Sequence, residues 1–162
     1  MNKAILYKIL RWATVLLAVI FLVNLYSDGK EGVTDASFAE LNEVVCAQVD
    51  TSLMQLAEPE RLERFYGVRA EEFANCTLYL PIDSMVYVEE LVLIELKDAS
   101  QKEALLAAID ARLNTQKNTF ENYNLYGQYE KLCDHAVIEV RGNFVLFAIN
   151  CDAAVKAFLA AV

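Results

Sequence analysis

The sequence predicts an α+β fold: an N-terminal transmembrane helix followed by one domain with a mostly antiparallel, four-stranded sheet packed by helices. The first observation is length, because 162 residues suffice for one ordinary domain and an anchor but not for two domains. The second is an uninterrupted apolar run near the N-terminus. The third is that apolar positions in the remainder alternate between helical spacing and short strand-like runs. A long helical pattern separates the second and third strands, so that helix should lie across one face of the sheet.

The N-terminal segment combines a basic flank with an apolar run: Lys3, Lys8, Arg11 and residues 12–23. Such a pattern is typical of a secretory signal, a lipoprotein signal or a membrane anchor. A lipoprotein signal needs a cysteine directly after the apolar run, whereas the first cysteine is Cys46. Crossing a bilayer takes about 20 residues, and residues 4–26 supply that length. We therefore expect an uncleaved signal-anchor that holds the protein in the membrane, with a cleaved signal as the alternative.

Charge around the anchor predicts its orientation. Cations precede the apolar run and acids follow it, so the N-terminus should stay in the cytoplasm and the rest should be exported. The expected division is residues 1–27 as cytoplasmic stub and transmembrane signal-anchor, 28–34 as linker and 35–162 as an exported α+β domain. The net charge of −9 disfavours binding to nucleic acid, because an acidic surface repels phosphates.

Caps and apolar spacing predict at least four helices. Ser37 followed by Glu40, and Ser100 followed by Glu103, match the capping box that begins helices. Gly67 suits the left-handed conformation that ends one. The expected helices span residues 38–49, 59–66, 101–122 and 152–161, the last with Asp152 as its N-cap.

Short apolar runs predict four strands, over residues 77–80, 91–96, 136–140 and 144–149. The last two should form a hairpin around Gly142 and Asn143, because both residue types accept positive φ in tight turns. Polar residues alternate along the third strand, so we expect it at an edge of the sheet. The fourth strand is apolar throughout and should be central.

Three segments carry a resemblance to a known family: residues 90–98, the helix with Arg112, Gln116 and Phe120, and residues 136–146. Together they resemble the bacterial family catalogued as domain of unknown function 4358, over about residues 34–162. The resemblance implies an exported envelope protein, because members are exported, many by lipoprotein signals. This chain departs from those members in lacking the lipid-attachment cysteine. No activity is assigned to the family, so the resemblance lends no catalytic residues.

Four cysteines stand in the predicted exported domain: Cys46, Cys76, Cys133 and Cys151. They could form two disulfides or act as small buried hydrophobes. Cys133 and Cys151 flank the predicted hairpin and are the candidate pair. Pairing centred on Gly142 would bring them face to face, whereas a two-residue loop of Gly142 and Asn143 would put them on opposite faces of the sheet.

One helical face presents a candidate ligand site. Arg112 and Gln116 are four residues apart, and Tyr123 and Tyr126 follow the same helix. An arginine, an amide and tyrosines could line a pocket for an anionic ligand or a glycan. The alternative, which we favour, is that Arg112 pairs with an acid of the domain and the tyrosines pack against the sheet.

The only histidine, His135, lies between Cys133 and Glu139. These three residues would suit a hydrolase or redox enzyme, but same-face neighbours on a strand stand about 7 Å apart, too far for a Cys–His hydrogen bond. The doublets Glu71–Glu72 and Glu89–Glu90 are expected to be surface charge. We expect no metal site and no cofactor. The predicted function is therefore a non-catalytic binding module of the bacterial cell envelope, whose partner is an envelope protein or a cell-wall component.

Overall fold

The computed structural model describes residues 36–122 and 127–162. The predicted anchor and linker lie outside these residues. Within the two described stretches, no helix combines the length and hydrophobicity that crossing a bilayer requires. Residues 34–162 form one compact unit.

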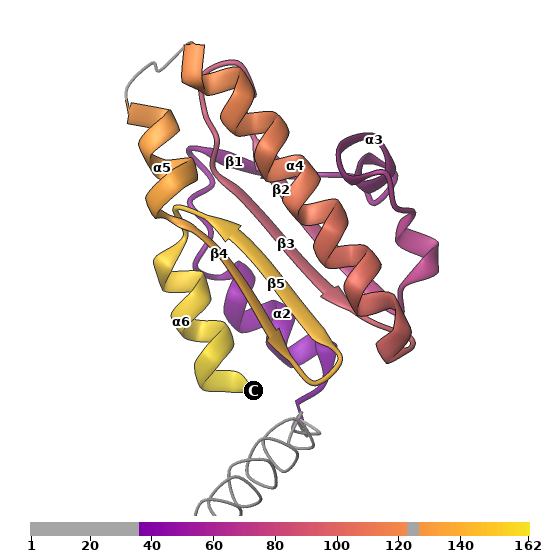
Figure 1. Ribbon diagram of the computed structural model, residues 1–162. Coiled ribbons are helices and arrows are strands. Elements are labelled where there is room, and N and C mark those ends of the chain that lie inside the picture. Colours follow the sequence, from indigo (N-terminus) through magenta and orange to yellow (C-terminus); the bar gives the residue numbers. More distant parts are fainter. Residues whose placement is uncertain (1–35, 123–126) are drawn as a thin grey trace, which may run out of the picture. The chain divides into compact units, whose positions relative to one another are not determined.

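The sheet has five strands, all paired antiparallel, in the order β1-β2-β3-β5-β4 (Figure 1). They are β1 (Met54–Leu56), β2 (Asn75–Pro81), β3 (Glu90–Glu95), β4 (Ala136–Arg141) and β5 (Phe144–Ile149). The α+β class and the antiparallel sheet are confirmed, but the prediction of four strands was wrong. The additional strand, β1, has only three residues, too few to show alternation.

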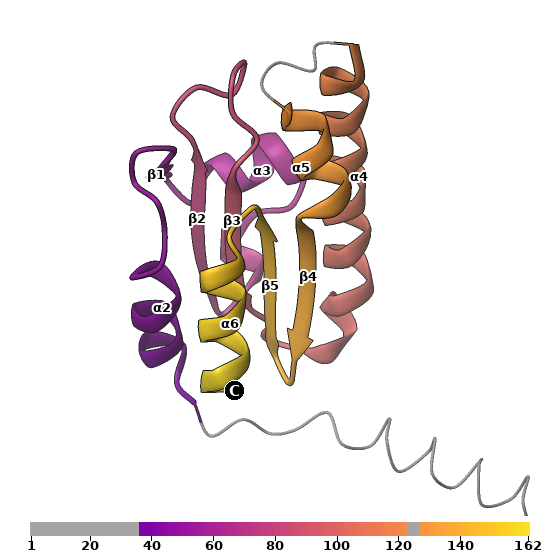
Figure 2. The same ribbon diagram turned by 90° about the vertical axis from the view of Figure 1, so that its left-hand side faces the viewer.

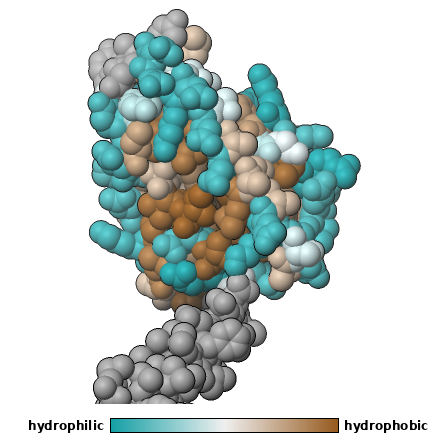
Figure 3. Space-filling view, in the orientation of Figure 1, coloured by the Kyte–Doolittle hydropathy of each residue, from teal (hydrophilic) through white to brown (hydrophobic). Residues whose placement is uncertain are grey.

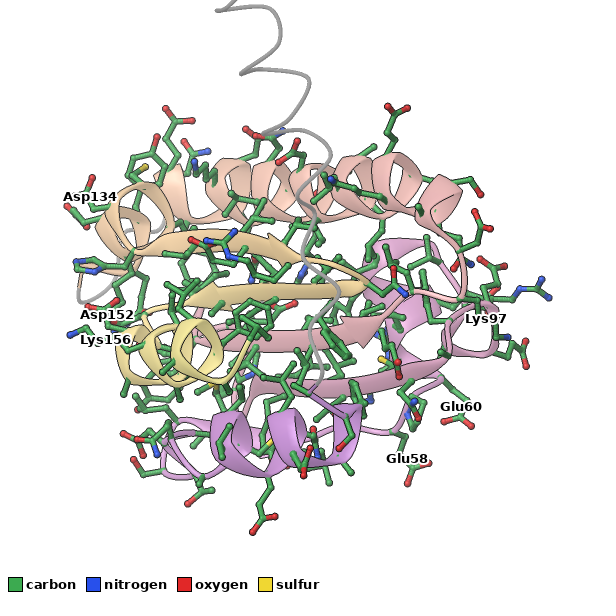
Figure 4. The ribbon with its side chains drawn as sticks, turned by 90° about the horizontal axis from the view of Figure 1, so that it is seen from below. Glu58, Glu60, Lys97, Asp134, Asp152 and Lys156 are labelled. Atoms are coloured by element: carbon green, nitrogen blue, oxygen red, sulfur yellow. The ribbon has the colours of Figure 1, made fainter. Side chains whose placement is uncertain are left out.

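Helices cover both faces of the sheet (Figures 1 and 2). They are α2 (Phe38–Cys46), α3 (Arg61–Tyr66), α4 (Lys102–Asn122), α5 (Gln128–Asp134) and α6 (Asp152–Ala161), with short 3₁₀ turns η1 (Ala70–Glu72) and η2 (Ala99–Gln101). One apolar cluster joins α3, α4 and α5 to the sheet, and a second joins α2 and α6 to it. Figure 4 views the domain from below, where labelled charged residues such as Lys97 and Lys156 point outward from it.

Local signals set several helix boundaries. The capping box of Ser37 and Glu40 is present, and Gly67 ends α3 at φ 72°. The predicted box at Ser100 was wrong: Asp98 caps η2, and α4 follows directly. Asp152 is the first residue of α6 rather than its N-cap.

Strands β3 and β5 form the centre of the core. Successive residues of β3 face opposite layers, so Val92 and Ile94 join one cluster while Leu91 and Leu93 join the other. Every residue of β5 is buried, and β4 is an outer strand that is half-buried along most of its length. The predicted places of these two strands, central and edge, are confirmed.

Candidate functional site

The first residue of β3, Glu90, is the centre of a buried polar cluster. Its side chain is 0% exposed. Alternate residues of a strand point to the same face, so Glu90 faces α4 together with Val92 and Ile94. A carboxylate removed from water at this depth requires strong hydrogen-bond donors and a compensating charge. The surrounding helices supply both.

Helix α4 provides the compensating charge. Arg112 Nη2 lies 2.8 Å from Glu90 Oε2 and its Nε lies 3.3 Å from Oε1, so the guanidinium binds both carboxylate oxygens. The guanidinium carbon also lies 4.7 Å from the ring centroid of Phe65, at cation–π distance. Arg112 is therefore fixed by an acid of the domain and by an aromatic ring of α3.

Two neutral donors complete the Glu90 cluster. Gln116 is one helical turn after Arg112 and donates from Nε2 to Glu90 Oε2 at 3.0 Å. The Tyr66 hydroxyl, at the end of α3, donates to Glu90 Oε1. Burial, and then the charge of Glu90, raise the pKa of Tyr66 well above its ordinary value, so the phenol stays protonated and acts as a donor.

The preceding residue, Glu89, has its own cluster and is 1% exposed. Lys131 Nζ of α5 lies 2.6 Å from Glu89 Oε1, and Asn150 Nδ2 donates to the same oxygen at 2.9 Å. Burial alone would raise the pKa of Glu89, but the hydrogen bonds from Lys131 and Asn150 outweigh it and lower that pKa. Asn150 has φ 54°, a left-handed conformation that asparagine tolerates better than most residues.

The expectation that Glu89 and Glu90 are surface charge was therefore wrong. Sequence reasoning missed them because their cations are remote in the chain: Arg112 is 22 residues from Glu90, and Lys131 is 42 residues from Glu89. Their position directly before the apolar run of β3 was the available signal. In each cluster one buried oxygen has no hydrogen-bond partner in the described part of the chain, Gln116 Oε1 in one and Glu89 Oε2 in the other.

The predicted ligand site comes together only in part. Arg112 and Gln116 do act on one carboxylate, but it is Glu90 of the same domain. Tyr123 and Tyr126 lie outside the described residues. Binding of an external anion by this set stays a prediction, and the donors it would use are engaged by Glu90.

No disulfide joins Cys133 and Cys151, and all four cysteines are free thiols. The hairpin explains this, because Arg141 pairs with Phe144 across a two-residue loop, the register that separates the two cysteines. Cys133 also lies in α5 rather than on the strand. Burial raises the pKa of Cys151 to about 12 and that of Cys76 to about 11, so both favour the unreactive thiol.

The three residues considered for catalysis are not assembled into a site. Cys133 belongs to α5, His135 is the C-cap of that helix, and Glu139 forms an ion pair with Arg141. No hydrogen bond or ion pair joins any two of these side chains among the described residues. No group of three or more His, Cys, Asp or Glu residues that could hold a metal ion occurs in the same part of the chain.

The structure is a small α+β domain in which two buried glutamate clusters lie within an otherwise apolar core. The family described as domain of unknown function (DUF4358) matches residues 47–150, which include all five strands and both glutamate clusters. The chain belongs to this family. No curated protein and no solved structure matches it.

Proposed function

We propose that this protein is a non-catalytic binding module of the bacterial cell envelope. Residues 4–26 anchor it in the cytoplasmic membrane, and the folded domain on the outer side holds an envelope protein or a cell-wall component. The observation that carries this proposal is an apolar area on the surface of the domain. Figure 3 shows this area on the face that is turned to the viewer in Figure 1, where β4 is the strand nearest to the viewer.

Four apolar residues of β4 and α4 are not fully buried. Ile138 and Val140 of β4, and Leu106 and Leu113 of α4, pack against the core yet remain only partly buried. Contiguous apolar surface on a soluble domain marks contact sites for other macromolecules. We call these four residues the β4–α4 patch.

The buried clusters support a scaffold role over a catalytic one. The guanidinium of Arg112 and the ammonium of Lys131 neutralise buried glutamates of the same domain. A catalytic group needs access to substrate, whereas these carboxylates are closed off within the domain. We therefore expect the partner to bind at the surface of the domain, where the β4–α4 patch offers apolar contact.

Site-specific photo-crosslinking in cells tests the proposal. A photoreactive amino acid replaces Leu106 in the full-length protein, with Ala111, which is exposed on the other side of α4, as the matched control. We expect the probe at position 106 to give one discrete adduct with an envelope component, identified by mass spectrometry, and the probe at 111 to give none. Equal labelling at both positions, or adducts with cytoplasmic proteins alone, would contradict the proposal.

A further inference from the structure

The outer edge of β4 is not paired with another strand of the described chain. Arg141 and Phe144 flank a two-residue turn and form a hydrogen-bonded pair, so alternate residues of β4 direct their backbone groups away from β5. Ile138 and Val140 are in this outward set. No strand of the described chain covers this edge, and the Val140 carbonyl accepts a hydrogen bond only from its neighbour, Arg141 Nη1, at 2.8 Å.

The opposite face of β4 displays a pair of charges. Glu139 Oε2 and Arg141 Nη2 lie 3.0 Å apart, and their side chains are 24% and 49% exposed. An isolated exposed pair of this kind contributes little to stability. Its arrangement along an open edge strand is nevertheless self-complementary, because the two charges are opposite and two residues apart.

Three registers of antiparallel pairing about a twofold axis can be compared, centred on Glu139, Ile138 and Val140. Centring on Glu139 places like charges opposite each other, which is unfavourable. Centring on Ile138 places Glu139 opposite the partner's Val137. Centring on Val140 places Glu139 opposite the partner's Arg141, and the twofold axis repeats this pair.

We propose that the protein forms a homodimer by antiparallel pairing of β4 edges, with Val140 on the twofold axis. In this register the Glu139 and Arg141 side chains of both copies form a ring of four alternating charges, in which each charge has opposite charges beside it along the strand and across it. The Val140 backbone groups bond to the partner's Val140, which replaces the contact from Arg141. The two sheets become one continuous sheet.

The predicted anchor and linker precede α2 in the chain, so the place where α2 begins must be compatible with this dimer. Figures 1 and 2 both show α2 beginning at the end of the domain where the β4–β5 hairpin lies. A twofold axis perpendicular to the sheet keeps the α2 helices of both copies on one face, and the chosen register brings both hairpins close to the axis. Two copies anchored in the same membrane, as the proposed function requires, can therefore pair. This compatibility rests on the proposed function, whereas the pairing of the β4 edges does not.

Cysteine crosslinking in native membranes tests the register. The full-length protein carries Cys133→Ser to remove the exposed thiol, with either Val140→Cys or the matched control Ile138→Cys. Across the axis, position 140 meets itself at about 5.5 Å between Cα atoms, within disulfide range. Position 138 is about 13 Å from its counterpart, out of range. We expect a disulfide dimer to form at least about tenfold faster from Val140→Cys. Faster dimer formation from Ile138→Cys, or none from either, would overturn the proposal.

Exchanging the charges of Glu139 and Arg141 tests independently whether the partner of β4 is a second copy of the chain. Glu139→Arg makes the edge all basic, and Arg141→Glu makes it all acidic. Two differently tagged full-length copies are co-expressed, and their co-purification is measured. We expect two copies of the same variant, both basic or both acidic, to co-purify severalfold less than two parent copies. A basic copy paired with an acidic copy should co-purify as well as the parent does. Equal recovery in every combination, as association through the anchor alone would give, would overturn the proposal.

Discussion

Replacing Arg112 with alanine should destabilise the domain strongly, because it leaves Glu90 as a buried carboxylate without a counter-charge. Removing one partner of a buried ion pair costs about 3–5 kcal/mol. The contact with Phe65 and the packing of the arginine stem are lost as well. Gln116 and Tyr66 still donate to the carboxylate, so we expect a loss of about 3 kcal/mol in the free energy of unfolding, the lower end of that range.

The assay is urea unfolding of residues 34–162, the compact unit. Far-ultraviolet circular dichroism is the suitable signal, because the only tryptophan, Trp12, is outside this fragment. Two controls separate charge from shape. Arg112→Lys keeps the charge but loses the two-pronged geometry, so it should cost less than Arg112→Ala.

The second control is a double variant, Arg112→Met with Glu90→Gln. It removes both charges, and should therefore be more stable than Arg112→Ala alone, because no charge remains buried without a partner. An Arg112→Ala fragment that unfolds at the same urea concentration as the parent would refute the structural role. Arg112 would then become the leading candidate for binding an external anion.

Three further predictions concern pH and the membrane segment. Because the pKa of Glu89 is lowered in the folded state, its contribution to stability is present above its unfolded pKa, about 4.5, and is lost as the pH falls through the folded pKa. In urea titrations, Lys131→Met should therefore be less stable than the parent at neutral pH, and this difference should shrink in acid; a difference independent of pH would contradict the assignment. A reporter active only outside the cytoplasm, fused after Val162, should give signal, whereas activity of a cytoplasmic reporter at the same position would refute the orientation. The full-length protein should stay in the membrane fraction through alkaline carbonate, with Met1 or Asn2 at its N-terminus by mass spectrometry; a mature N-terminus within residues 27–30 would identify a cleaved signal instead.

The local signals of the sequence predicted much of the fold. The capping box at Ser37 and the terminating Gly67 each set a helix boundary with residues that are neighbours in the chain. The false capping box at Ser100 shows the limit of this reasoning, because Asp98 and Gln101 have the same spacing and occupy the real cap.

Short elements without periodicity were missed. Strand β1 has three residues and α5 has seven, and neither is long enough to establish a repeat. The omission of α5 had a consequence for the site, because it led to Cys133 and His135 being placed on the strand and left Lys131 without an assigned role. Pairing of Arg112 with an acid of the domain was predicted, but local spacing could not identify Glu90 as that acid.

The two adjacent glutamates also explain why this sheet takes one arrangement with its helices. Glu90 meets Arg112 of α4, whereas the preceding residue, Glu89, meets Lys131 of α5. A shift of β3 by one residue would put one glutamate in the place of the other, move the other glutamate into the apolar place of Val88 or Leu91, and leave one of the two cations without its acid. Apolar residues of β3 would tolerate such a shift more readily, since both faces of the strand are apolar. We infer that the buried glutamates fix the register of β3, and through it the hydrogen-bonding partners that position β5 and the exposed edge of β4.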